Sequence, residues 1–183
     1  MTNSTNQLLY PHMKALIQAA KDFARNAHYG HVRKYTGEPY WVHTETVADI
    51  VSRYGGSWEQ IAAAHLHDTL EDTETTFDEL ENLFGHDVAT LVEELTDFYT
   101  KQAFPNMNRV ARKLREAMRL GNISNRAKTI KVADLIDNTA SIIEHDPEFA
   151  KVYLQEKASV LAVMSGANPS LLQVALKQIE KNP

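Results

Sequence analysis

The chain has 183 residues, 43% of them hydrophobic and 23% charged, with eight histidines and no cysteine. This length suits one domain, and the absence of cysteine excludes disulfides, thiolate metal sites and a cysteine nucleophile. The net charge of −5 argues against a nucleic-acid-binding protein. No apolar run approaches the roughly 20 residues of a membrane span, and the first seven residues lack the basic start of a signal peptide. We therefore expect a cytoplasmic protein that makes no membrane contact and uses histidine and carboxylate for any metal site.

Apolar residues recur at intervals of three and four along the whole chain, which predicts helices and no strands. Thr44 and Ser57 are predicted to cap two of these helices, and Gly37 and Pro39 lie in a loop between the first two. The predicted helices span about 13–30, 44–53, 57–69, 76–84, 87–98, 107–119, 124–144, 148–164 and 169–181. The prediction is an all-α fold of eight to ten helices, forming one compact domain over residues 1–183.

The order of the charges is more informative than their total. From His67 to Asp97 the chain carries eleven acidic residues and no Lys or Arg, and from Lys101 to Lys131 it carries nine basic residues and one acid, Glu116. The acidic block could face a cation and the basic block an anion. Alternatively, both blocks are solvated helix faces that form ion pairs with each other.

The most specific polar pattern lies around the pair His67-Asp68. Two other His-Asp pairs, at 86–87 and 145–146, fall at a predicted helix start and end, where capping and the helix dipole explain them. Only the first pair is followed by carboxylates at helical spacing. If the helix continues to Asp72, then His67 lies one turn from Glu71, and Asp68 one turn from Asp72. Four groups able to bind a hard or borderline cation would then share one flank.

A second candidate is Asp134, which sits in a mostly apolar helix with Asn138 one turn further along. A carboxylate in such a stretch is costly to bury unless it is paired or bound to a metal. Two interpretations remain open at this stage: Asp134 is a metal ligand, or it forms a structural salt bridge with Lys131, three residues before it.

These motifs occur together, in order, in one known family. Over about residues 13 to 165 the chain resembles the HD-type hydrolase domain of the RelA/SpoT alarmone enzymes, particularly the single-domain small alarmone hydrolases. The segments that carry the resemblance are His28, Arg33-Lys34, Gly37 to Tyr40, His43, His67 to Thr73, Phe84-Gly85, Leu95 to Asp97, and Lys131 to Asp134 with Asn138.

The resemblance assigns roles to positions of this sequence. It implies four ligands for a divalent metal, usually manganese: His43, His67, Asp68 and Asp134. Glu71 and Asp72 would position or activate the attacking water. Arg33 and Lys34 would contact substrate phosphates, and Asn138 would line the site near the ribose.

The roles of two further residues are open to more than one interpretation. Tyr153, in the penultimate predicted helix, would border the nucleotide as an aromatic does in relatives, or it is a core tyrosine. His65, two positions before His67, points away from the metal face and is expected to be a buried or supporting histidine.

The activity implied by the resemblance is metal-dependent hydrolysis of the 3′-pyrophosphate of a purine alarmone such as (p)ppGpp or (p)ppApp. Its products would be the nucleoside 5′-di- or triphosphate and pyrophosphate. Two alternatives stay open: a phosphatase acting on another nucleotide, such as a 2′- or 3′-phosphorylated cofactor, and a nucleotide-binding regulator without catalysis. No nucleic-acid partner is expected, and assembly into a homo-oligomer is left open.

Overall fold

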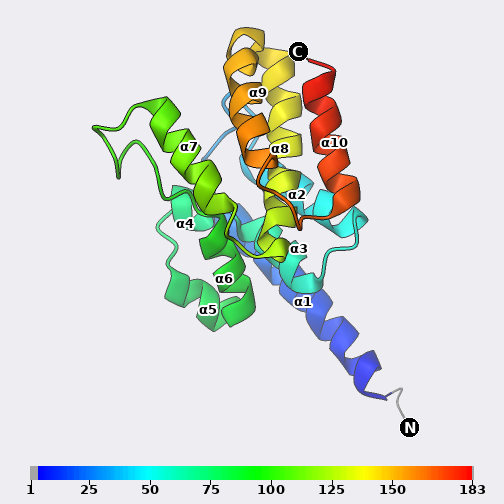
Figure 1. The fold of residues 1–183 in the computed structure, drawn as a ribbon. Helices are drawn as coiled ribbons and strands as arrows, with labels where there is room; N and C mark the ends of the chain where they lie inside the picture. The colour runs from blue at the N-terminus through cyan, green and yellow to red at the C-terminus, as the bar shows by residue number, and fades with distance from the viewer. Residues whose placement is uncertain (1–3, 183) are drawn as a thin grey trace.

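The computed structural model describes residues 4–182, with side chains from residue 11 onward, and this part of the chain is built from α-helices (Figure 1). Its only extended pairing is a single antiparallel bridge between Val32 and Pro39. The all-α prediction is confirmed. The helices are α1 Ser4–Ala27, α2 Trp41–Arg53, α3 Trp58–Leu66, α4 Thr69–Asp72, α5 Phe77–Phe84, α6 His86–Leu95, α7 Arg109–Leu120, α8 Asn125–His145, α9 Pro147–Leu161 and α10 Pro169–Glu180.

Helix α8 is the centre of the packing. It contacts α2, α3, α6, α9 and α10, so it has neighbours on several sides, whereas α7 packs mainly against α9. In Figure 1, α8, α9 and α10 run side by side, and α7 with its preceding loop reaches out from the bundle. Ile130, Val132 and Ala133 of α8 have no exposed surface, and the next residue, Asp134, is buried as well. The core helix therefore carries a carboxylate into the interior.

Several helix boundaries differ from the sequence prediction: α1 begins at Ser4 and not near residue 13, and two further differences lie close to the polar motifs. Helix α2 begins at Trp41, so Thr44 does not cap it but lies inside the first turn, where its hydroxyl donates to the carbonyl of Trp41. Ser57 does cap α3, in a capping box with Gln60. That helix ends at Leu66 and does not continue to residue 69.

The early end of α3 has a local cause. The side chain of Thr69 donates to the carbonyl of Leu66, and the ring of His67 bonds to the carbonyl of Ala64. Side chains that take these carbonyls compete with continuation of the helix. His67 and Asp68 therefore lie in a turn between α3 and α4. Asp68 still lies one turn before Asp72, whose backbone N–H donates to the carbonyl of Asp68 at 2.9 Å.

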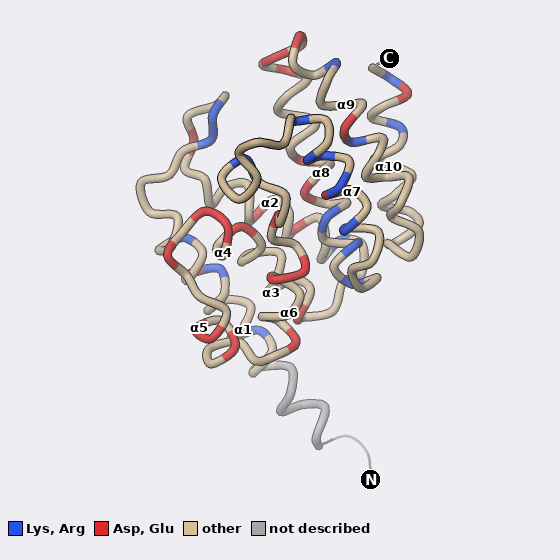
Figure 2. Tube along the Cα trace, turned by 60° about the vertical axis from the view of Figure 1, so that its left-hand side comes forward, with Lys and Arg blue, Asp and Glu red and all other residues tan. Residues whose placement is uncertain are grey.

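Figure 2 shows acidic residues along α4 to α6 and basic residues along α7 and the start of α8. The two charged blocks meet in ion pairs: Lys113 lies 3.3 Å from Asp97, and Arg126 lies 3.4 Å from Asp87. The interpretation as mutually paired helix faces therefore holds for these residues. No helix in the described residues combines the length and apolarity needed to cross a membrane.

Lys157 of α9 is a buried cation with neutral partners. Its side chain is 1% exposed, and its ammonium donates to the Thr139 hydroxyl at 2.8 Å and to the Gln178 side-chain oxygen at 2.6 Å. Burial lowers the pKa of Lys157 from 10.5 to about 8. Because the unfolded chain then binds more protons than the folded one between these values, this group makes the fold more stable as the pH rises through that window.

We predict that the wild type gains as much as ~3 kcal/mol in free energy of unfolding between pH 8 and pH 10.5 relative to the variant Lys157→Met. Methionine fills a similar volume and does not titrate. The measurement is urea denaturation of both proteins at several pH values across the window. Parallel pH profiles for the two proteins would contradict the prediction.

Candidate metal centre

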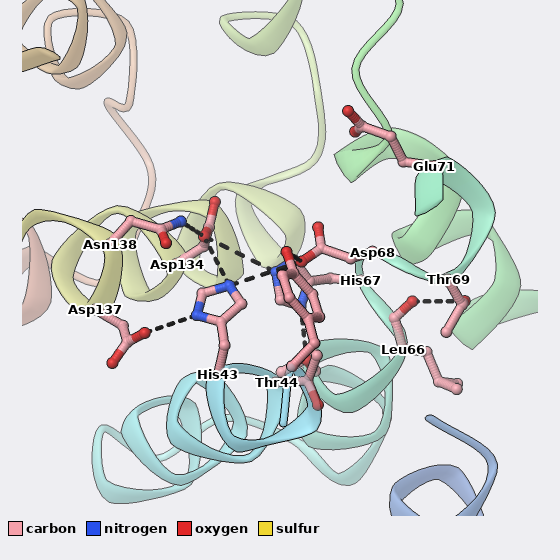
Figure 3. Close-up of polar contacts among 12 residues, drawn as sticks. His43, Thr44, Leu66, His67, Asp68, Thr69, Glu71, Asp134, Asp137 and Asn138 are labelled. Atoms are coloured by element: carbon pink, nitrogen blue, oxygen red, sulfur yellow. Dashed lines mark hydrogen bonds and ion pairs between the residues drawn. The ribbon is translucent and has the colours of Figure 1, made fainter. Parts of the chain in front are cut away.

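Three parts of the chain bring two histidines and two carboxylates together (Figure 3). His43 comes from α2, His67 and Asp68 from the turn after α3, and Asp134 from the middle of α8. Donor atoms of His43, His67 and Asp134 all lie within 4.8 Å of one another. Asp68 joins them, with an oxygen 3.0 Å from Nε2 of His67 and 3.7 Å from Nε2 of His43.

The second nitrogen of each imidazole ring has an acceptor that fixes its proton. Nδ1 of His43 lies 2.7 Å from a carboxylate oxygen of Asp137, and Nδ1 of His67 lies 2.9 Å from the carbonyl oxygen of Ala64. Since these oxygens accept hydrogen bonds, both rings carry a proton on Nδ1. In the neutral form the lone pair of each ring is then on Nε2, the atom turned toward the cluster.

The cluster fits a divalent cation. Both Nε2 atoms are buried and have no hydrogen-bond partner, although a carboxylate oxygen of Asp134 lies 3.3 Å from Nε2 of His43. Lone pairs and carboxylate oxygens that converge in a buried place repel one another unless positive charge lies between them. Burial alone would lower the pKa of His43, but the hydrogen bond to Asp137 and the negative charges of Asp134 and Asp68 outweigh it and raise the pKa to about 9. The centre attracts positive charge, and its mixed nitrogen and oxygen donors suit a metal ion.

Asp134 forms the salt bridge of one interpretation left open by the sequence, and its position is compatible with the metal-ligand role of the other. One of its oxygens lies 3.0 Å from the ammonium of Lys131, and the other accepts a hydrogen bond from Asn138 at 2.6 Å and faces His43. Despite its burial, the ammonium of Lys131 and the neighbouring His43 and His67 hold the pKa of Asp134 well below its usual range. The salt bridge keeps the carboxylate ionised and leaves its other oxygen toward the imidazoles.

Asp68 is oriented by a tyrosine from the loop before α2. The hydroxyl of Tyr40 donates to Asp68 at 2.7 Å, to the same oxygen that approaches His67. Burial would raise the pKa of Asp68, but the neighbouring His67 lowers it well below the usual value. Asp68 is therefore ionised and held in place.

Glu71 and Asp72 lie outside this cluster. In Figure 3, Glu71 lies on α4 beyond Asp68, and its carboxylate accepts the backbone N–H of Asp97 at 3.1 Å. Glu71 is exposed, and partial desolvation together with the neighbouring Asp97 raises its pKa to about 7. Asp72 borders a different hollow, together with His31 of the loop after α1. Of the two, Glu71 lies on the side of Asp97, a residue that lines the cavity beside the metal centre.

The two residues predicted to bind phosphate, Arg33 and Lys34, also differ in their position relative to the metal centre. A guanidinium nitrogen of Arg33 lies 2.6 Å from Asp137, which places Arg33 beside His43. Lys34 is exposed, hydrogen-bonds to the Tyr35 hydroxyl and lies over its ring. The structure thus links Arg33 to the metal centre through one shared residue, whereas Lys34 stands further out.

A cavity of about 170 Å³ adjoins the centre between α7, α8 and α9. It shares Asp134 and Asn138 with the centre, and Tyr153 lines it with a hydroxyl that is buried and unpaired. Lys113 and Lys131 of the basic block also line it. His65 is buried away from this region, near Glu45, and burial lowers its pKa to about 4, in keeping with the expected buried histidine.

Two supporting residues were not identified from the sequence. Asp137 is three residues after Asp134 on the same helix, a spacing that could have marked it as a neighbour of the site. Tyr40 belongs to the segment that carries the family resemblance, but its partner Asp68 is 28 residues away. Nothing in local spacing points to that contact.

The all-α bundle with a buried His/Asp centre is the arrangement of the metal-dependent phosphohydrolases. The chain belongs to the HD domain family, whose model matches residues 20–169, and it is a hydrolase of that family. The inclusion of the remaining residues in the same domain stays a prediction.

Relatives and solved structures agree with this assignment. The chain is 37% identical over 165 residues to the guanosine-3′,5′-bis(diphosphate) 3′-pyrophosphohydrolase MESH1 of Xenopus tropicalis, covering 86% of this chain and 89% of the relative. An Aquifex aeolicus guanosine-3′,5′-bis(diphosphate) 3′-pyrophosphohydrolase is 33% identical over 85% of this chain, which spans 22% of that relative's length. A solved structure described as a metazoan ortholog of SpoT that hydrolyses ppGpp matches with a TM-score of 0.81 and 28% identity, covering 91% of this chain and 95% of that one. The resemblance inferred from the motifs is confirmed.

We predict that a divalent cation raises the Tm of the protein by several degrees and that Asp68→Ala removes this rise, because a ligand that binds only the folded state stabilises it by mass action. The measurement is thermal unfolding with and without Mg²⁺, Mn²⁺ or Zn²⁺. The matched control is Asp87→Ala, which changes the aspartate of another His-Asp pair that is exposed on α6. Equal cation-induced shifts in the two variants would contradict the assignment of the centre.

Proposed function

We propose that this protein hydrolyses the 3′-pyrophosphate of a purine alarmone such as (p)ppGpp or (p)ppApp, with Mn²⁺ as its metal. The observation that carries the proposal is the joint placement of a buried two-histidine, two-carboxylate centre, an arginine beside it and a cavity that opens from it. The relatives named for this reaction align over most of the chain. The products are the nucleoside 5′-di- or triphosphate and pyrophosphate.

The proposed ligands are His43, His67, Asp68 and Asp134. Two imidazole nitrogens and two carboxylates leave open positions on an octahedral ion, a donor set that suits Mn²⁺. When bound, the ion supplies Lewis-acid polarisation of a phosphoryl oxygen and lowers the pKa of water in the site.

In the proposed reaction, water attacks the phosphorus atom that carries the ribose 3′-oxygen, and the bond between that phosphorus and the 3′-oxygen breaks. One proton of the water ends on the 3′-oxygen, and the hydroxyl group stays on the released pyrophosphate. Glu71 accepts the proton of the attacking water, because its raised pKa near 7 makes it a base matched to neutral pH. Asp72 borders a different hollow, so its contribution to orienting the water is the negative charge that it adds near Asp68.

Arg33 and Lys34 bind the substrate phosphates. Arg33 uses one guanidinium nitrogen for Asp137, and its planar fork can offer further donors to a phosphate. Lys34 is exposed and reaches outward over Tyr35, which suits a more distant phosphate. Asn138 and Tyr153 line the cavity that would receive the nucleoside, where the unpaired Tyr153 hydroxyl is free to hydrogen-bond the ligand.

The test is release of pyrophosphate from ppGpp and ppApp by the purified protein with Mn²⁺, compared by kcat/KM with a panel of 2′- and 3′-phosphorylated nucleotides. We expect turnover of at least one 3′-pyrophosphorylated nucleotide, abolished by chelation. Preference for a 2′- or 3′-monophosphate would favour the phosphatase alternative. Binding without any turnover would favour a regulator.

We also predict that Glu71→Gln lowers kcat by 10²-fold or more while leaving Mn²⁺ affinity within a few-fold of the wild type, since Glu71 lies outside the ligand cluster. In the wild type, kcat/KM should rise with pH up to about 7 and level off above it, because the base is active when deprotonated. A Gln variant with full turnover, or a profile that is flat through pH 7, would show that Glu71 is not the base.

A further inference from the structure

We propose that Asp137 is a positioning residue that joins the phosphate-binding Arg33 to the metal ligand His43. The part that concerns Arg33 rests on the proposed function, whereas the part that concerns His43 depends only on the geometry of the centre. Asp137 lies on α8, one turn after Asp134, and its side chain is 15% exposed.

A single oxygen of Asp137 serves both partners. Its Oδ2 atom accepts from Nδ1 of His43 at 2.7 Å and from a guanidinium nitrogen of Arg33 at 2.6 Å. The three groups come from three different segments: the loop after α1, helix α2 and helix α8. One carboxylate therefore fixes the relative positions of a candidate ligand and a candidate phosphate-binding group.

The first consequence concerns the tautomer of His43. A ring whose Nδ1–H is held by a carboxylate presents its Nε2 lone pair to the cluster, and the carboxylate also makes the ring a stronger ligand. Without Asp137, nothing else in the described contacts of His43 holds Nδ1. The His43 ring could then adopt both tautomers. In part of the protein molecules Nε2 would carry the proton and could not bind a metal.

The second consequence concerns charge. Arg33 is always cationic, and its nitrogen shares one acceptor atom with His43, so the two groups are close neighbours. An imidazole that binds a cation, or carries a second proton, would repel the guanidinium at this distance. The negative charge of Asp137 lies between them and offsets that repulsion. It thereby allows an arginine to stand beside the metal centre and face a phosphate.

Two substitutions separate the hydrogen bonds from the charge. Asp137→Asn keeps an oxygen that can accept from both partners but has no charge, whereas Asp137→Ala removes both. The matched control is Asp49→Ala on α2, the helix that carries His43, because Asp49 is exposed and, among the described residues, forms its ion pair with Arg53. Circular dichroism and Tm establish that each variant is folded.

The first experiment needs no substrate. Nitrogen-15 NMR of the histidine rings in the metal-free protein reports the tautomer of His43, assigned by comparison with His43→Gln, and calorimetry reports Mn²⁺ affinity. We expect Asp137→Ala to lose the fixed Nδ1–H form and to bind Mn²⁺ roughly 10–100-fold more weakly. Asp137→Asn should keep the tautomer and weaken binding less, and Asp49→Ala should match the wild type. Wild-type tautomer and affinity in folded Asp137→Ala would overturn the proposal.

The second experiment tests the link to Arg33 by a double-mutant cycle. Arg33→Ala should raise KM with little change in Mn²⁺ affinity, because Asp137 still holds His43. If Asp137 positions Arg33, the loss of kcat/KM in the double variant should be smaller than the product of the two single losses. Independent, multiplicative losses would overturn the link. Absence of turnover in the wild type would refute the proposed function and not the tautomer result.

Discussion

The convergence of two imidazole lone pairs and two carboxylates in a buried place is the constraint on which the rest of this structure depends. Such a cluster is unstable by itself, because acceptor atoms face one another without water. The protein offsets this cost by giving each group a further partner. The pairs are His43 with Asp137, His67 with the Ala64 carbonyl, Asp68 with Tyr40, and Asp134 with Lys131 and Asn138. The Nε2 atoms of both histidines have no hydrogen-bond partner and can accept a cation.

The same constraint explains why α8 is the central helix. A carboxylate can be buried in a helix core only if a cation and a donor reach it, and Lys131 and Asn138 do so from the same helix. With Asp134 satisfied locally, Ile130, Val132 and Ala133 of α8 can be buried beside it in a helix that packs against five others. The ligand and the packing surface are therefore carried by one element.

Around this centre the surroundings are asymmetric, which suits an extended anionic substrate. Arg33 lies on the side of His43, while the cavity between α7, α8 and α9 opens on the side of Asp134 and Asn138. Glu71 lies toward Asp97 at the edge of that cavity, with a pKa near 7. A phosphate-binding arginine, a proton acceptor and a cavity for a nucleoside therefore surround one metal position.

The sequence by itself determined the helical fold, the placement of most helices and the metal-ligand candidates, because helical periodicity and the combination of short motifs are local signals. It did not determine where α3 ends, since hydroxyl and ring contacts of Thr69 and His67 to backbone carbonyls decided that. Only the tertiary structure decided which predicted residues meet. It joined Arg33 to His43 through Asp137, a residue 104 positions from Arg33. It also brought Asp97 against Glu71 and His31 to the hollow that Asp72 borders, because contacts between distant segments are fixed by how the helices pack and not by spacing along the chain.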